Sequence, residues 1–314
     1  MRALVFDGVL KVSQVAKPII ADGQALLKIR KAGICNTDME LVRGYKDFHG
    51  ILGHEFVADV VEGDVFWQGK RVVGSISINC DVCDMCLQGV SSQCRNRTTM
   101  GINGHDGAFA DFMMLTANNL YQVSDSISDA AAVFVEPLAA CLQITEAVHI
   151  SPRDNVVVIG AGKMGMLAAQ VLKLTGANLS VVIRHEKQGR LLEKWGIRAV
   201  RKSDIAPKQA QIIVDCTGNA SGFHDALDLV QPRGTIVLKS TYADLPQADL
   251  TRVVVDEIRV VGSRCGSFDA ALRLLEANLV DVESLIEARY PFNSALEAFE
   301  FAQQRGVLKV LLEF

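Results

Sequence analysis

The stretch NVVVIGAGKMG, residues 155–165, decides the fold. Its first five residues form an apolar run suited to a buried parallel strand. Gly160, Gly162 and Gly165 follow, then MLAAQVLKLTG has a helical pattern and LSVVI at 179–183 reads as a second strand. This order is typical of a dinucleotide-binding unit, so we expect the glycines, Lys163 and Met164 to hold a pyrophosphate at the helix N-terminus. The alternative is a glycine-rich turn in a generic α/β unit.

The end of the second strand bears on the choice of cofactor. NAD-binding units usually carry an acidic residue there to hold the ribose 2′-hydroxyl. Here the sequence reads Arg184-His185-Glu186-Lys187, and Arg184 falls nineteen residues after Gly165. A guanidinium can pair bidentately with a 2′-phosphate, so we expect NADP(H), with Arg184 and either His185 or Lys187 as phosphate contacts. The alternative is NAD(H), with Glu186 on the ribose.

The whole chain has 314 residues, which is enough for two domains at roughly 150 residues each. Residues 151–284 alternate strand-like runs with longer helical patterns, as a doubly wound parallel sheet requires. Residues 1–150 are rich in short alternating strands and turns, which suit a β-rich, Greek-key-like body. Residues 285–314 combine an amphipathic helix with a final strand. The predicted fold class is therefore α/β.

Composition narrows the class of protein. Hydrophobic residues make up 49% and charged residues 22%, as in ordinary globular proteins. A net charge of −4 gives no electrostatic reason to expect nucleic acid or anionic lipid as a partner. No apolar run approaches the ~18 residues of a membrane span, and MRALVFDGVLKV lacks a signal-peptide core. We therefore expect a cytoplasmic enzyme with a small-molecule substrate.

Four cysteines lie close together in CDVCDMCLQGVSSQC, residues 80–94. They are Cys80, Cys83, Cys86 and Cys94. This spacing lets a short lobe arrange its thiolates as a tetrahedron, which suits Zn²⁺. In a reducing cytosol clustered cysteines are more often metal ligands than disulfides. Because thiolates would fill every position, this zinc would be structural. The alternatives are a pair of disulfides or an iron–sulfur cluster.

A second group of candidate ligands is spread along the sequence. Cys35 follows the alternating run ALLKIRKA, and His54 and Glu55 precede the strand-like FVADVVEG. Glu136 stands in the apolar stretch AAVFVEPLAACLQ, where a carboxylate is costly unless it is paired or bound to a cation. Cys, His and Glu are the mixed ligands of a catalytic zinc that keeps one position open. Singly, each could instead be a core or capping residue.

These pieces together resemble the zinc-dependent medium-chain dehydrogenase/reductase family. The matching motifs are GICNTD at 33–38, GHE at 53–55, the four-cysteine lobe at 80–94, GAFADF at 107–112, VEPLA at 135–139 and the glycine loop. They occur in the family's order and cover nearly the whole chain. An acidic residue in the VEP motif is similar to the polyol, threonine and glucose dehydrogenase branches.

The resemblance implies roles for individual residues. Cys35 and His54 would bind the catalytic zinc, and Glu55 and Glu136 would compete for the remaining protein position. Thr37 would hydrogen-bond the substrate oxygen and start a proton relay. Alcohol dehydrogenases often place a His three residues beyond this hydroxyl, whereas this chain has Glu40, so the relay must run differently.

The resemblance also implies an architecture. A GroES-like catalytic domain would comprise residues 1–150 and 285–314, and a Rossmann domain residues 151–284, with the active site in the cleft between them. Two Zn²⁺ ions per subunit and a homo-oligomer, dimer or tetramer, are expected.

The predicted function is a zinc-dependent dehydrogenase that transfers a hydride between a hydroxyl-bearing carbon of an alcohol, polyol or sugar and NAD(P), with NADP(H) favoured. One alternative is a zinc-independent reductase of quinones or enones from the same superfamily, which would not need Cys35, His54 and Glu136. Another is a catalytically silent sensor that binds NADP(H), which would be favoured if only the four-cysteine lobe held metal.

Overall fold

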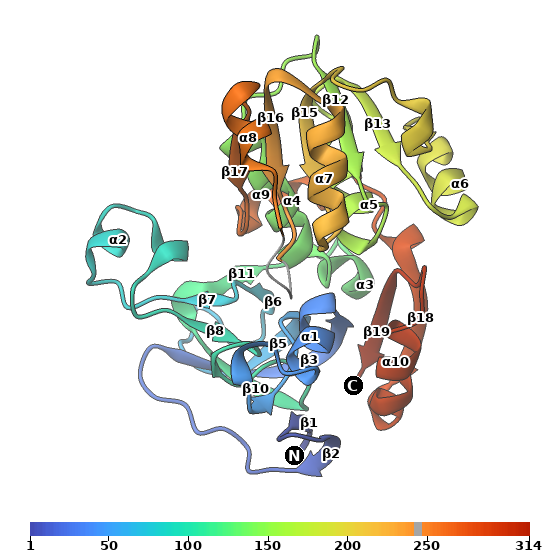
Figure 1. Cartoon of the computed structure of the whole chain (residues 1–314). Helices are drawn as coiled ribbons and strands as arrows, with labels where there is room; N and C mark the ends of the chain where they lie inside the picture. The colour runs from blue at the N-terminus through green and yellow to red at the C-terminus, as the bar shows by residue number, and fades with distance from the viewer. Residues whose placement is uncertain (242–246) are drawn as a thin grey trace. The chain divides into compact units, whose positions relative to one another are not determined.

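The computed structural model describes residues 1–241 and 247–314, which form two compact units (Figure 1). One unit comprises Met1–Glu136 and Phe268–Phe314, and the other Pro137–Ser267. Both divisions fall earlier in the chain than residues 150 and 284. The reason is that helix α4 (Val135–Ala147) lies almost entirely in the second unit, whereas helix α9 (Phe268–Glu276) belongs to the first. There Phe268 stacks on Tyr121, with ring centroids 5.0 Å apart.

The first unit is organised around a seven-stranded mixed sheet. Its order is β11 (Leu120–Gln122), β6 (Arg71–Gly74), β5 (Glu55–Glu62), β3 (Gln24–Ile34), β19 (Lys309–Glu313) and β18 (Ile286–Pro291), with β10 (Phe112–Thr116) also paired to β3. Strand β19 pairs with β3 antiparallel, with Val310 opposite Ile34. The strand that leads into Cys35 therefore lies between the strand that starts at Glu55 and the strand that starts at Lys309.

Shorter elements complete this unit. Two three-stranded sheets have the orders β2 (Leu10–Gln14), β1 (Arg2–Phe6), β4 (Gly50–Ile51) and β7 (Ser77–Ile78), β8 (Thr98–Met100), β9 (Gly104–His105). The α-helices besides α9 are α1 (Asn36–Val42), α2 (Asp84–Leu87), α3 (Asp129–Ala132) and α10 (Ala295–Ala302). Single 3₁₀ turns cover 45–47, 91–93, 117–119, 283–285 and 292–294. The core includes the fully buried Leu27, Ile34, Phe109 and Phe134.

The second unit is a six-stranded parallel sheet with helices, which confirms the predicted doubly wound arrangement and the α/β class. The strand order is β14 (Arg198–Val200), β13 (Asn178–Val182), β12 (Asn155–Ile159), β15 (Ala210–Asp215), β16 (Val230–Leu238) and β17 (Arg259–Gly262). Its helices, besides α4, are α5 (Lys163–Lys173), α6 (Glu186–Lys194), α7 (Ala220–Leu229) and α8 (Leu250–Val255), with a 3₁₀ turn at 202–204. Figure 1 shows α7 across the near face of this sheet.

The register of this sheet aligns its strand ends. Ile159 pairs with Asp215, Asp215 with Leu238, and Leu238 with Gly262, across β12, β15, β16 and β17. The residues that directly follow these four strands therefore lie side by side in one further row, along the carboxyl edge of the sheet. We call Gly160, Cys216, Lys239 and Ser263 the edge row. Ligands of doubly wound sheets bind at this edge.

Among the residues described, no helix is long and apolar enough to cross a membrane.

Candidate functional site

The first candidate site is built where β3 ends and β5 begins. Cys35 follows the last residue of β3 and caps the N-terminus of α1, in whose first turn Asp38 lies. The fully buried Asp38 carboxylate accepts the Cys35 N–H at 2.8 Å and the Gly53 N–H at 3.2 Å. It thereby ties the two motifs GICNTD and GHE to one another. His54 and Glu55, which follow Gly53, are placed beside Cys35 as a result.

Three predicted ligands converge here. One side-chain ligand atom each of Cys35, His54 and Glu55 lies within 4.8 Å of the others, and His54 and Glu55 are buried. Thr37 Oγ1 lies 3.8 Å from Cys35 Sγ, so the predicted relay hydroxyl borders the cluster. Glu136, in the first turn of α4, is not one of the three residues that form this cluster within the described chain. A thiolate, an imidazole and a carboxylate together fit a catalytic zinc.

Asp38 is a component of the site that the sequence analysis missed. Its Oδ1 lies 3.2 Å from His54 Nδ1. Burial lowers the pKa of His54, but the charge of Asp38 and its hydrogen bond, together with Cys35, outweigh this and raise the pKa well above its usual value. The site therefore has an electrostatic environment that favours a cation at or near the imidazole. A carboxylate behind a histidine is also the usual outer partner of a metal-binding imidazole.

Lys309 is a second component that was missed. Its Nζ forms a buried ion pair with Glu55 Oε2, and both side chains are at most 3% exposed. A Cβ at position 33 would come within 2.6 Å of Glu55 Oε2 and 3.3 Å of Lys309 Cδ, so the glycine there leaves room for the pair. Burial lowers the pKa of Lys309, but Glu55, together with the charges of Cys35 and Asp38, more than compensates and the pKa is raised. The Glu55 carboxylate is therefore already balanced by a cation from β19.

The four-cysteine lobe has the geometry of a closed metal site. The Sγ–Sγ distances are 3.5 Å for Cys83 and Cys86, 3.9 Å for Cys83 and Cys94, and 3.5 Å for Cys94 and Cys80. Zinc–sulfur bonds of about 2.3 Å give a tetrahedron with edges of about 3.8 Å, whereas a disulfide bond is about 2.0 Å long. All four residues are free thiols. The lobe therefore fits a tetrahedral metal ion and contains no disulfide.

The surroundings of these thiols explain why a cation would bind. Backbone N–H groups of Val82 and Cys83 lower the pKa of Cys80 to about 6, which favours its thiolate. Burial, followed by the hydrogen bonds with Cys83 and Cys94 and the charge of a Cys83 thiolate, raises the pKa of Cys86 to about 12, so neighbouring thiolates repel one another. A bound divalent cation would relieve this repulsion. Arg95 donates two hydrogen bonds of 2.6 Å to Asp84 and so braces the lobe.

The glycine loop fits a dinucleotide. Gly160 adopts a positive φ of 97°, and a Cβ at 165 would overlap the Gly160 carbonyl oxygen, so the turn requires both glycines. A Cβ at 162 would meet nothing within 4 Å, so the N-cap of α5 borders open space. These are the three roles that glycines play around a pyrophosphate. Lys163 and Met164 begin α5, and Met164 Sδ lies 3.2 Å from the buried Cys141 Sγ.

A basic residue that the sequence analysis did not identify lies beside the end of β13. Arg201, just beyond β14, donates to the Arg184 carbonyl oxygen at 2.8 Å and forms an ion pair with Glu186. Arg184 and His185 are exposed, and His185 is the N-cap residue of α6. Glu186, the alternative ribose ligand, is therefore engaged by a guanidinium. Parallel strands place their ends together, which is the signal that could have brought Arg201 into consideration.

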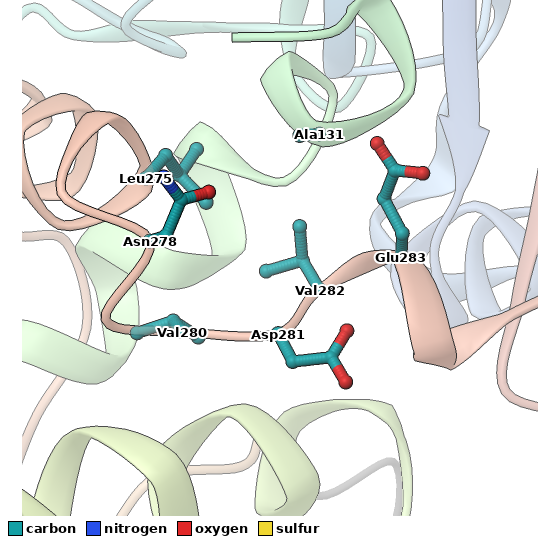
Figure 2. A pocket seen from close by; sticks show the side chains of 7 residues that line it. All are labelled: Ala131, Leu275, Asn278, Val280, Asp281, Val282 and Glu283. Atoms are coloured by element: carbon teal, nitrogen blue, oxygen red, sulfur yellow. The ribbon is translucent and has the colours of Figure 1, made fainter.

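The first unit also contains a pocket of about 330 Å³, shown in Figure 2. Ala131, Leu275, Asn278, Val280, Asp281, Val282 and Glu283 line it. Its carboxylates are held by serines: Ser284 donates to Asp281 through its N–H at 3.1 Å and its hydroxyl at 2.6 Å, and Ser128 donates to Glu283. No predicted site residue lines this pocket, which is part of the framework around α3 and α9.

Comparisons with known proteins identify related families. A family profile described as an alcohol dehydrogenase GroES-like domain matches residues 21–125, and one described as a zinc-binding dehydrogenase matches residues 164–277. Sorbitol dehydrogenase from Halalkalibacterium halodurans is 27% identical over 340 residues, which cover 99% of each chain. L-galactonate-5-dehydrogenase from Escherichia coli is 26% identical over 321 residues, which cover 95% of this chain and 94% of the relative.

A solved structure extends the likeness to three dimensions. A zinc-binding dehydrogenase from Sinorhizobium meliloti, bound to NADP, is similar with a TM-score of 0.90 and 25% sequence identity. The match covers 100% of this chain and 99% of that one.

Proposed function

The chain belongs to the zinc-dependent medium-chain dehydrogenase family, and we propose that it transfers a hydride between a hydroxyl-bearing carbon of a polyol or sugar-like alcohol and NADP(H). The family's reaction is oxidoreduction of CH–OH groups with a nicotinamide cofactor. The observation that carries the proposal is the convergence of Cys35, His54 and Glu55 next to the Thr37 hydroxyl. Sorbitol and L-galactonate dehydrogenases among the relatives support a hydroxyl-rich substrate.

Each residue of the cluster has a proposed role. When bound, zinc supplies a Lewis acid that lowers the pKa of the substrate hydroxyl, and the nicotinamide exchanges the hydride. Cys35 and His54 hold the metal, and Asp38 fixes their orientation through the Cys35 N–H and His54 Nδ1. Thr37 accepts a hydrogen bond from the substrate hydroxyl and relays its proton, taking it up as the threonine's own hydroxyl proton passes on to water. Lys309 keeps the buried Glu55 carboxylate in place.

Glu55 and Glu136 are alternative ligands for the remaining zinc position in this proposal. Glu55 lies in the cluster but is paired with Lys309, which lowers its availability to the metal. Glu136 would therefore be the ligand while Glu55 stays on Lys309, and Glu55 would become available to the metal when that pair opens. Glu136→Gln and Glu55→Gln variants, assayed for bound zinc, test this division. Loss of zinc from neither variant would contradict it.

Support for NADP(H) comes from the end of β13. Two arginines, Arg184 and Arg201, lie at the carboxyl ends of adjacent parallel strands, and the acidic alternative, Glu186, is paired with one of them. Guanidinium groups bind phosphate bidentately, whereas an engaged carboxylate is less able to hold a ribose hydroxyl. We assign His185, which lies beside Arg184, to the same phosphate subsite.

A homo-oligomer is also part of the proposal. Strand β17 forms one edge of the parallel sheet, and Val260 on it is exposed together with Leu250, Val254 and Val255 of α8. Unpaired sheet edges and exposed apolar side chains are common association sites. We place the protein in the cytoplasm, where a reducing environment keeps the four lobe thiols available for zinc.

The first test is the zinc content per chain, measured by elemental mass spectrometry on protein purified without chelators. Two zinc ions per chain, with oxidation of polyols or sugars in the presence of NADP⁺, are expected. One ion per chain, retained by a variant that lacks Cys35, would remove the catalytic metal site and with it the proposed function.

A further inference from the structure

Lys239 carries a buried ammonium group that the proposed chemistry does not use. It follows the last residue of β16 and is 8% exposed. Its Nζ donates to the Ser263 carbonyl oxygen at 3.1 Å and to the Arg264 carbonyl oxygen at 2.7 Å. Burying an ammonium group costs several kcal/mol unless acceptors compensate for the lost water. A lysine at this position therefore points to a task that an apolar side chain could not perform.

Lys239 adds a second set of contacts to the segment that follows β17. Ser263 is buried, and its Oγ has no hydrogen-bond partner among the residues described. A buried hydroxyl without a partner is unfavourable, so Ser263 would turn toward a partner if its backbone were released. The Ser263 N–H donates to the Leu238 carbonyl oxygen at 3.1 Å, and the Ser263 carbonyl oxygen accepts a hydrogen bond from Lys239 Nζ. Both backbone groups of Ser263 are therefore held. Lys239 thus acts as a clamp on the end of β17.

The position of the clamp along the sheet identifies what it serves. Lys239 and Ser263 belong to the edge row, in which Gly160 opens the glycine loop. Gly160 lies two strands away from Lys239, which is about 10 Å at about 4.8 Å per strand. In a doubly wound sheet of this strand order, each half receives one mononucleotide of the cofactor. The glycine loop and Arg184 lie in the half that takes the adenine nucleotide, and Lys239 lies in the other half.

We propose that Lys239 is a positioning residue for the nicotinamide nucleotide. Its ammonium group holds Ser263 and Arg264 in the conformation that receives this half of the cofactor, without itself contacting the adenine half. The inference rests on the proposed function, because it requires that the edge row binds a nicotinamide dinucleotide.

The test compares a whole dinucleotide with its adenine half. NADPH and 2′-phospho-ADP-ribose, which lacks nicotinamide, are titrated against the protein and its Lys239→Met variant by isothermal calorimetry; NADH and ADP-ribose form the parallel pair. We expect the Kd of NADPH to rise at least tenfold in the variant, which corresponds to about 1.4 kcal/mol. The Kd of 2′-phospho-ADP-ribose should stay within twofold. Amide hydrogen exchange should accelerate at residues 263–264.

Two further variants make the result specific. Lys173→Met removes another lysine that donates to a backbone carbonyl in the same unit, that of Trp195, and should leave both affinities within twofold. Lys239→Gln keeps an uncharged donor and should give an intermediate loss; it also replaces Lys239→Met if that variant does not fold. Equal weakening of both ligands, or of neither, would overturn the role of Lys239. Absence of dinucleotide binding by the unmodified protein would instead overturn the proposed function.

Discussion

Replacing Asp38 by Asn tests whether the buried carboxylate orients the metal ligands. Asp38 accepts two backbone N–H groups, from Cys35 at 2.8 Å and Gly53 at 3.2 Å, and lies 3.2 Å from His54 Nδ1. An amide has one oxygen, so its NH₂ group must face one of these donors and break that contact. A hydrogen bond to a charged group contributes about 1.5–3 kcal/mol, and the free energy of unfolding should fall by about this amount.

The larger effect should be on zinc. Loss of an outer carboxylate typically weakens metal binding 10- to 100-fold, or about 1.4–2.7 kcal/mol. Chelator titration followed by elemental analysis should show that Asp38→Asn loses one zinc ion at a 10- to 100-fold lower chelator concentration. The ion in the four-cysteine lobe serves as an internal reference and should be retained.

Asp106→Asn is the matched control. Its carboxylate accepts a backbone N–H, from Ile51 at 2.9 Å, in the same unit, and both zinc ions should be released as in the unmodified protein. If Asp38→Asn folds and releases both zinc ions at the same chelator concentrations as the unmodified protein, the carboxylate has no influence on the metal.

Four further predictions concern other parts of the molecule. Lys309→Met should lower the free energy of unfolding by about 3–5 kcal/mol in chemical denaturation, because it leaves Glu55 buried without a counter-ion; adding Glu55→Gln should restore most of this, and failure to do so would contradict the pairing. Cys83→Ser should reduce zinc to one ion per chain, and unchanged content would argue against the four-sulfur site. Arg184→Ala should weaken the binding of NADPH at least tenfold more than the binding of NADH, whereas equal losses of affinity would exclude a phosphate contact. Val255→Lys should shift the protein toward monomer in light scattering if α8 lies in a subunit interface.

The parts of the site that are local in sequence could be predicted, and the parts that depend on strand pairing could not. The four cysteines lie within one short lobe, and the glycine loop is one strand–turn–helix, so spacing alone indicated them. Lys309 is 254 residues away from Glu55, and their contact exists because β19 and β5 both pair with β3. Only a lysine directly before the apolar residues Val310–Leu312 hinted at a buried partner.

The same reasoning explains the other differences. Asp38 stands in a motif that the sequence analysis quoted, but its role depends on Gly53 coming close enough for one carboxylate to reach both backbones. The ring of Phe268, the first residue of α9, stacks on Tyr121 of the same unit, a contact that periodicity alone does not show.

The placement of β19 has a consequence for how the protein is made. Residues 137–267 form a unit of their own, and each of its strands is available once that continuous segment has left the ribosome. The first unit cannot complete its sheet until Lys309–Glu313 has been translated, long after Cys35, His54 and Glu55. During that interval Glu55 lacks its ammonium partner. Completion of the proposed metal cluster should therefore wait until Lys309–Glu313 has been made, while the four-cysteine lobe is complete much earlier on the nascent chain.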